Sequence, residues 1–181
     1  AAEVGKIAQE YGVPYLLDAC QAAGQMRISV SELNCDFLSA TGRKFLRGPR
    51  GTGFLYVKEK WLASLEPAMI DHFGAPWVAR GRYELRDDAR RFETWENSYA
   101  LRAGLGAAID YADKIGIDLI QDRVSMLADK TRSFLSEDPR ITLRDIGQTQ
   151  CGIASFSIDG RDPSQIVRQM AEVGFVIGAS P

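Results

Sequence analysis

The sequence contains very little histidine and cysteine. Its single histidine, His72, excludes a multi-histidine metal cluster, and nothing in the spacing supports a Cys–His pair. The three cysteines, Cys20, Cys35 and Cys151, are odd in number and form no CxxC pair. This usage argues against a disulfide framework or a zinc site. It favours a reducing compartment, which we take to be the cytoplasm.

Long apolar runs and a strong net charge are also missing. No apolar run approaches the length of a membrane span, and the N-terminal segment lacks the apolar core of a signal peptide. The formal net charge is −2, so no overall basic field would attract nucleic acid or an anionic membrane. We therefore expect neither a membrane nor a nucleic acid as a partner.

What is present is the composition of an ordinary globular domain, with 45% hydrophobic and 25% charged residues among 181. This length suffices for one large domain or for a domain and a half. The chain opens in helix-like sequence without an initiator methionine and stops directly after an apolar run. We therefore expect a piece of a longer protein, truncated at both ends.

Hydrophobic periodicity predicts helices alternating with strands, and a change of domain near residue 118. Before it we expect a helix at 1–11, a buried strand at 13–17, and two more strands at 37–40 and 51–57. A short helix at 58–65, an irregular segment at 66–97 and a helix at 98–115 capped by Ser98 should follow. After it we expect a helix at 118–135, strands at 140–144 and 151–158, a helix at 162–173 and a last strand at 174–178.

Lys44 lies in the most informative segment of the chain. A predicted strand ends in a small polar turn, presents this lysine, and passes through a glycine-rich loop into the next strand. A lysine beside Ser, Thr, Gly and Arg can meet an aldehyde and a phosphate together, and pyridoxal phosphate carries both groups. The alternative is a basic surface loop, because most lysines are solvated.

Asp18 and Gln21 form a second informative pair. Asp18 follows a predicted buried strand, where α/β sheets place ligand chemistry. A carboxylate there could keep the pyridine nitrogen of the cofactor protonated, and Gln21, three residues on, could donate to its phenolic oxygen. The alternative is that Asp18 merely caps a helical turn over residues 19–24.

These segments together resemble the class V aminotransferase family. The family comprises pyridoxal-phosphate enzymes of fold type I, among them cysteine desulfurases, isopenicillin-N-epimerase-like proteins and sulfoxide lyases. The resemblance extends over almost the whole chain. It rests on an Asp-x-x-Gln motif, an Asp-Phe pair and a Lys-x-x-x-Gly-Pro-x-Gly-x-Gly motif, found in Leu17–Gly24, Asp36-Phe37, Thr41–Lys44 and Gly48–Val57.

The resemblance implies an α/β fold class in two parts. Residues 1–117 would be the C-terminal part of the large cofactor-binding domain of a fold type I transferase, with a mostly parallel sheet and helices. Residues 118–181 would be a linker helix and part of a small α+β domain, truncated like the first part. Pyridoxal 5'-phosphate is the implied cofactor, an amino acid the substrate, and a homodimer the assembly of the intact protein.

The resemblance also implies roles for single residues. Lys44 would form the Schiff base with the cofactor, Asp18 would partner the pyridinium nitrogen, and Gln21 would contact the phenolic oxygen. Thr41 and Arg43 would lie at the phosphate, where the family usually has a serine and a histidine. An arginine before the lysine is closer to the epimerase-like and sulfoxide-lyase branches than to cysteine desulfurases.

Some functional elements of the family have no assigned residue in this chain. A family threonine that reaches the partner subunit's phosphate aligns with Glu96, or with Thr94 in a shifted register. The N-terminal phosphate loop, the substrate-carboxylate arginine and the mobile cysteine of desulfurases have no assigned position, and the three cysteines are interpreted as small buried residues. The reaction therefore stays open between transamination, epimerisation and C–S lyase chemistry.

Two other functions are weighed against this one. The first is a nucleotide- or phosphate-binding α/β module that uses the glycines from Gly48 to Gly53, but that segment leads into a predicted strand, whereas a dinucleotide loop leads into a helix. The second is a non-catalytic fragment, which would lack the parts of the pocket that lie elsewhere.

Overall fold

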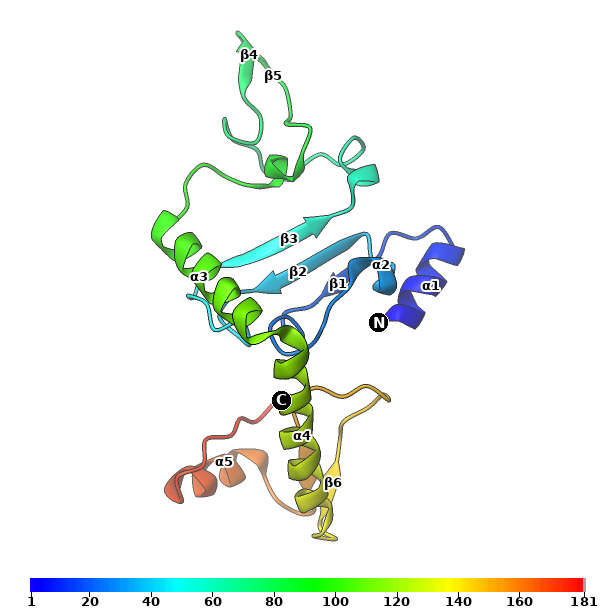
Figure 1. Cartoon of the computed structure of the whole chain (residues 1–181), viewed down its shortest axis with the longest axis vertical. Helices are drawn as coiled ribbons and strands as arrows, with labels where there is room; N and C mark the ends of the chain where they lie inside the picture. The colour runs from blue at the N-terminus through cyan, green and yellow to red at the C-terminus, as the bar shows by residue number, and fades with distance from the viewer. Residues whose placement is uncertain (181) are drawn as a thin grey trace. The chain divides into compact units, whose positions relative to one another are not determined.

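The computed structural model describes residues 1–180 and divides the chain into two compact units (Figure 1). The first unit comprises Ala1–Asp118, and the second begins at Leu119. Within residues 1–180, no helix is both long and apolar enough to cross a membrane.

The first unit is built on a three-stranded sheet in the order β1-β2-β3 (Figure 1). Strand β1 (Leu16–Asp18) runs parallel to β2 (Phe37–Thr41), whereas β3 (Gly53–Val57) runs antiparallel to β2. All three strands were predicted, with ends that differ by up to three residues. In β2 the buried side chains are Leu38 and Ala40, which alternate with half-buried residues as a strand packed on one side requires.

Helices flank the sheet. Helix α1 (Ala2–Glu10) packs on the short α2 (Val30–Leu33), and α3 (Tyr99–Ile115) passes beside the end of the sheet where β2 finishes and β3 begins (Figure 1). The predicted cap of α3 is confirmed, because Ser98 Oγ accepts a hydrogen bond from Leu101 N–H at 3.4 Å. One apolar core joins the sheet, α3 and the loops between them. Its buried members are Ala19, Ala23, Cys35, Leu38, Ala40, Leu46 and Leu105.

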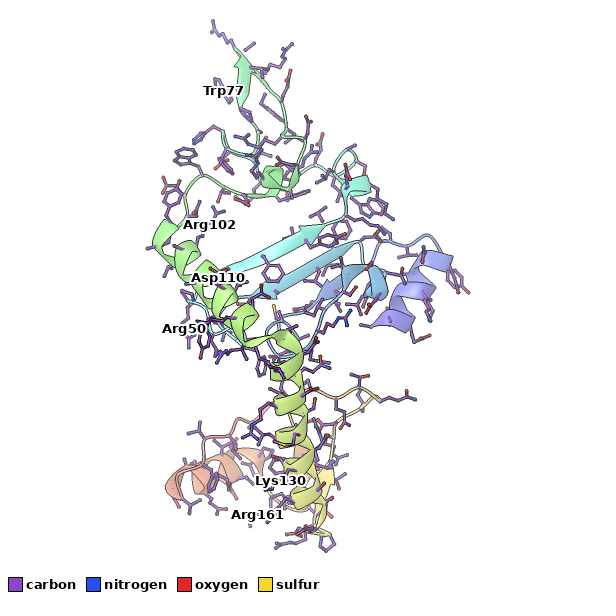
Figure 2. The ribbon with its side chains drawn as sticks, viewed as in Figure 1. Arg50, Trp77, Arg102, Asp110, Lys130 and Arg161 are labelled. Atoms are coloured by element: carbon purple, nitrogen blue, oxygen red, sulfur yellow. The ribbon has the colours of Figure 1, made fainter. Side chains whose placement is uncertain are left out.

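The segment between β3 and α3 is more ordered than its sequence suggests. It contains two 3-10 turns, η1 (Glu59–Trp61) and η2 (Ala89–Phe92), and an antiparallel hairpin of β4 (Trp77–Ala79) with β5 (Arg82–Tyr83). Trp77 stands on this hairpin with 76% of its surface exposed (Figure 2).

The short helix predicted over Lys58–Leu65 is wrong, since only the η1 turn forms there. This turn is fixed to the sheet by tertiary contacts. The ammonium of Lys60 pairs with the buried Asp36 at 2.7 Å, and the ring of Trp61 packs on Phe37 with centroids 5.8 Å apart. A helix register that placed these side chains elsewhere would lose both contacts.

The second unit contains helix α4 (Ile117–Ser136, which starts just before the unit boundary), the antiparallel strands β6 (Ile141–Leu143) and β7 (Phe156–Ile158), and helix α5 (Pro163–Glu172). The buried Arg132 holds it together: Nε donates to Asp145 Oδ2 at 2.7 Å, and NH2 donates to the carbonyls of Cys151 and Ile153, each at 2.8 Å. The strand predicted over 174–178 is wrong, because no neighbouring strand pairs with this segment and Val176 is 96% exposed.

Candidate active site

Two of the predicted site residues end neighbouring parallel strands. Asp18 is the last residue of β1 and Thr41 the last residue of β2, and the register pairs Asp18 with Ser39. Ligands of open α/β sheets bind outside the carboxyl ends of such strands. The edge formed by Asp18 and Thr41, here called the carboxyl edge, is therefore where the fold itself favours chemistry.

The carboxylate of Asp18 is exposed at the carboxyl edge and is held by the turn that follows it. Its Oδ1 accepts a hydrogen bond from the backbone N–H of Cys20 at 2.8 Å, as in an Asx turn. The pKa of Asp18 lies below its ordinary value, because the Cys20 thiol and N–H donate to the carboxylate and because the Lys44 ammonium is nearby. Asp18 thus stays negatively charged at neutral pH.

Cys20 lies beside Asp18 at the carboxyl edge, although the sequence analysis interpreted it only as a small buried residue. It is only half-buried, and its pKa is raised by the hydrogen bond to Asp18 and by burial, while the Thr41 backbone and Lys44 act in the opposite direction. The raised pKa favours the protonated form of the thiol at neutral pH. A thiol two residues after a carboxylate that ends a strand was the available signal.

Lys44 is half-buried in the loop that follows β2, close enough to Asp18 and Cys20 to act on the charges of both. The loop is closed at its base, where Gly48 N–H donates to the carbonyl of Gly42 at 2.8 Å. The structure therefore brings together the amine and the carboxylate that the sequence singled out, from two different strand ends.

The other three predicted residues lie at the same edge with less definite contacts. The Thr41 hydroxyl is half-buried and donates to the carbonyl of Thr52 at 3.4 Å. Arg43 and Gln21 are exposed, and the backbone carbonyl of Gln21 accepts from the Gln25 side chain. Their side chains are free to turn toward a ligand, and their predicted roles remain proposals.

The turn after Asp18 packs directly against the backbone of the Lys44 loop. Gly24 has a φ of +93°, and a Cβ there would lie 2.4 Å from the backbone nitrogen of Leu46 and 2.4 Å from the carbonyl carbon of Phe45. No other residue fits this contact. Residues 19–24 form hydrogen-bonded turns and not the regular helix that an N-cap at Asp18 would begin.

A groove of the first unit lies elsewhere. It has a volume of about 790 Å³ and is lined by β3, by residues 89–98 and by α3. Its polar wall includes Arg102, which pairs with Glu93 at 3.4 Å (Figure 2). None of the five predicted site residues lines it, although Thr52 and Leu105 touch both the groove and the Lys44 loop.

The geometry also bears on a dinucleotide-binding loop and on a metal site. The glycine-rich segment up to Gly53 leads into β3 and not into a helix, so it lacks the helix N-terminus on which a dinucleotide phosphate would rest. Among residues 1–180, no three His, Cys, Asp or Glu side chains gather as a metal site.

The chain matches known proteins along almost its whole length. The sequence model of the family described as aminotransferase class-V matches residues 1–179. A probable cysteine desulfurase from Methanothermobacter thermautotrophicus is 35% identical over 170 residues, which cover 94% of this chain and 42% of that protein. The chain thus spans less than half the length of this curated relative.

Solved structures show the same relationship. The apo structure of a cysteine desulfurase from Thermococcus onnurineus matches with a TM-score of 0.87 at 29% identity, over 97% of this chain and 44% of that one. A structure of C-DES with glycine covalently linked to its PLP cofactor matches with a TM-score of 0.86 at 24% identity, over 97% and 47%. The second match shows a shared fold.

Proposed function

Because the chain belongs to the aminotransferase class-V family, we propose that it is part of a pyridoxal-phosphate-dependent enzyme that acts on an amino acid. Pyridoxal 5'-phosphate is the cofactor that membership in this family brings. The observation that carries the proposal is the half-buried Lys44 near the Asp18 carboxylate at the carboxyl edge.

Among the reactions open to such an enzyme, C–S bond cleavage is the one that the relatives favour. The similar curated protein is a probable cysteine desulfurase, and a further similar structure is the complex of the cystine C-S lyase C-DES with its reaction product cysteine persulfide. Transamination and epimerisation have no comparable support, and neither has the epimerase-like branch suggested by Arg43. We therefore propose a sulfur-containing amino acid as the substrate.

The donor set at the carboxyl edge fits the cofactor. It offers one amine, one charged carboxylate, a hydroxyl and a guanidinium, which are the partners for an aldehyde, a protonated ring nitrogen and a phosphate. We assign Lys44 to the aldehyde, Asp18 to the ring nitrogen and Gln21 to the phenolic oxygen. Thr41 and Arg43 are assigned to the phosphate. When bound, the cofactor supplies an electron sink for negative charge that forms on the substrate.

The residues of this chain have three tasks in that chemistry. Asp18 holds a proton on the ring nitrogen, and its depressed pKa keeps it charged for this purpose. Cys20 orients the carboxylate through its N–H and its thiol. The Lys44 Nζ takes the proton from the α-carbon of the substrate, because it is a basic nitrogen near Asp18 and Cys20.

The domains, the assembly and the compartment of the protein are also proposals. Residues 1–117 would belong to the large domain and 118–181 to the small domain of a homodimeric enzyme. A partner-subunit contact would involve Glu96 or Thr94, both of which are exposed. The three unpaired cysteines agree with a cytoplasmic protein.

The proposal is tested by adding pyridoxal phosphate to the purified protein and recording the imine absorbance band. We expect a band in the wild type, its loss in Lys44→Ala, and its retention in Lys114→Ala, a matched exposed lysine on α3. A wild-type protein without the band, or a band that survives in Lys44→Ala, contradicts the assignment of Lys44 to the cofactor. A protein that binds no cofactor would be the non-catalytic fragment.

A further inference from the structure

Residues Gly42–Gly48, here called the lysine loop, turn sharply at Arg47. The N–H of Arg47 donates to the carbonyl of Lys44 at 2.9 Å, directly before the Gly48 to Gly42 hydrogen bond that closes the loop. Arg47 has a φ of +60°, in the left-handed region that residues with a side chain seldom adopt. A strained position of this kind is retained where the surrounding structure holds it.

Only one other residue with a side chain has a positive φ in the described part of the chain. It is Asn34, which terminates α2, and asparagine tolerates this conformation well. Arg47 terminates no helix, and glycine would adopt its backbone conformation without strain. The arginine side chain must therefore contribute something that glycine would not.

That contribution is a contact with α3. The guanidinium of Arg47 lies over the ring of Tyr111, 5.3 Å from its centroid. The same helix supports both ends of the loop, because Leu105 packs so closely on Gly42 and Gly48 that a Cβ at either would lie within 2.9 Å of Leu105 Cδ1. Both partners of the Arg47–Tyr111 contact are exposed, so its effect is local to the loop and separate from the core.

We propose that Arg47 is a positioning residue for Lys44 and that the Tyr111 ring anchors it. The proposal rests on the proposed function of Lys44. The left-handed φ at Arg47 directs the chain so that the next residue, Gly48, donates its N–H to the Gly42 carbonyl and closes the loop around Lys44, and the cation–π contact with Tyr111 stabilises that turn against its strain. Lys44 is thereby held at the carboxyl edge before any ligand arrives, and the entropy of fixing it is not lost on binding.

The first test is hydrogen exchange of the lysine loop in the cofactor-free protein. In Arg47→Ala and in Tyr111→Ala, the amides of Arg47 and Gly48 should exchange about two- to fivefold faster, the effect of losing one exposed cation–π contact. The double variant should be no faster than either single one, because both remove the same contact. Tyr111→Phe, which keeps the ring, and Tyr99→Ala, an equally exposed tyrosine of α3, should match the wild type.

The second test measures how fast pyridoxal phosphate attaches to Lys44, trapped with borohydride and quantified by mass spectrometry. The rate should fall about two- to fivefold in Arg47→Ala and Tyr111→Ala and stay unchanged in Tyr111→Phe. A variant that only weakened folding would lower the denaturation midpoint, and its attachment rate would not depend on whether the ring at position 111 is kept. Arg47→Gly serves as a second variant, because it removes both the contact with Tyr111 and the backbone strain.

The outcomes separate the two claims. Equal exchange in Tyr111→Ala and Tyr111→Phe, or additive effects in the double variant, overturns the anchoring of the loop by Tyr111. Faster exchange with an unchanged attachment rate overturns the positioning of Lys44. A wild-type protein that forms no adduct on Lys44 overturns the proposed function and with it the role of Arg47 toward the cofactor, while the exchange data still decide the anchoring.

Discussion

The contact between Gly24 and the Lys44 loop gives the most demanding prediction. Gly24→Ala adds one methyl group where two backbones meet, since the new Cβ would lie 2.4 Å from the backbone of both Phe45 and Leu46. Neither neighbour is the mobile end of a side chain, so the backbone itself must move. The variant therefore changes both folding stability and the placement of Lys44.

The magnitude follows from two separate penalties. An alanine at φ +93° bears the left-handed strain, about 1–2 kcal/mol, and the clash is a case of overpacking, about 1–3 kcal/mol. Together they predict a loss of about 2–5 kcal/mol from the free energy of unfolding of the first unit. If the loop moves away to make room, cofactor attachment to Lys44 should slow as well.

Urea titration followed by tryptophan fluorescence measures this loss, because the three tryptophans all lie in residues 1–118. Two matched glycines separate the penalties. Gly81→Ala has positive φ but open space around its Cβ, and should cost only the strain of about 1–2 kcal/mol. Gly106→Ala is helical and open, and should stabilise by about 0.5–1 kcal/mol. A Gly24→Ala variant no less stable than Gly81→Ala would refute the reasoning.

Three further predictions concern other parts of the chain. Ser98→Ala should lower the free energy of unfolding by about 1 kcal/mol in the same urea titration, because it removes the cap of α3. Arg132→Ala should cost about 3–5 kcal/mol and unfold the second unit first in a hydrogen-exchange experiment, because it leaves Asp145 without its partner; protection equal to wild type would contradict this. Asp138 should titrate with a pKa of about 2 by NMR, held there by the Arg140 side chain, and Arg140→Ala should raise that pKa toward 3.8.

The pH dependence of the second unit follows from Asp145. Its folded pKa lies below the ordinary value of 3.8, because Ser155 and Arg132 donate to the carboxylate. A depressed folded pKa stabilises the fold above the unfolded pKa, and that stability is lost as the pH falls through the folded value. Acid unfolding of this unit should thus begin below about pH 4 and shift to higher pH in Ser155→Ala.

Local chemistry and the family resemblance made the cofactor predictable, while the roles of the single site residues stay predictions. Lys44, Asp18 and their spacing pointed to one cofactor, because each residue type has few chemical groups that suit it as partners. The Ser98 cap could be predicted because it acts within one helical turn. The strand predicted over 174–178 failed because strand formation depends on pairing. Residues 174–178 have the composition of a strand, but a strand forms only where another can pair with it.

The sequence by itself determined which chemical groups are present and, to within a few residues, where the three strands of the first unit's main sheet and most helices lie. Only the tertiary structure decided how they meet: that β3 runs antiparallel to β2, that Gly24 packs on the backbone of the lysine loop, and that Tyr111 lies against Arg47 of that loop. The physical reason is distance along the chain. Propensity, periodicity and capping act over a few residues, whereas the contacts of Gly24 and Tyr111 with the lysine loop join residues more than 20 and more than 60 positions apart, and packing selects them.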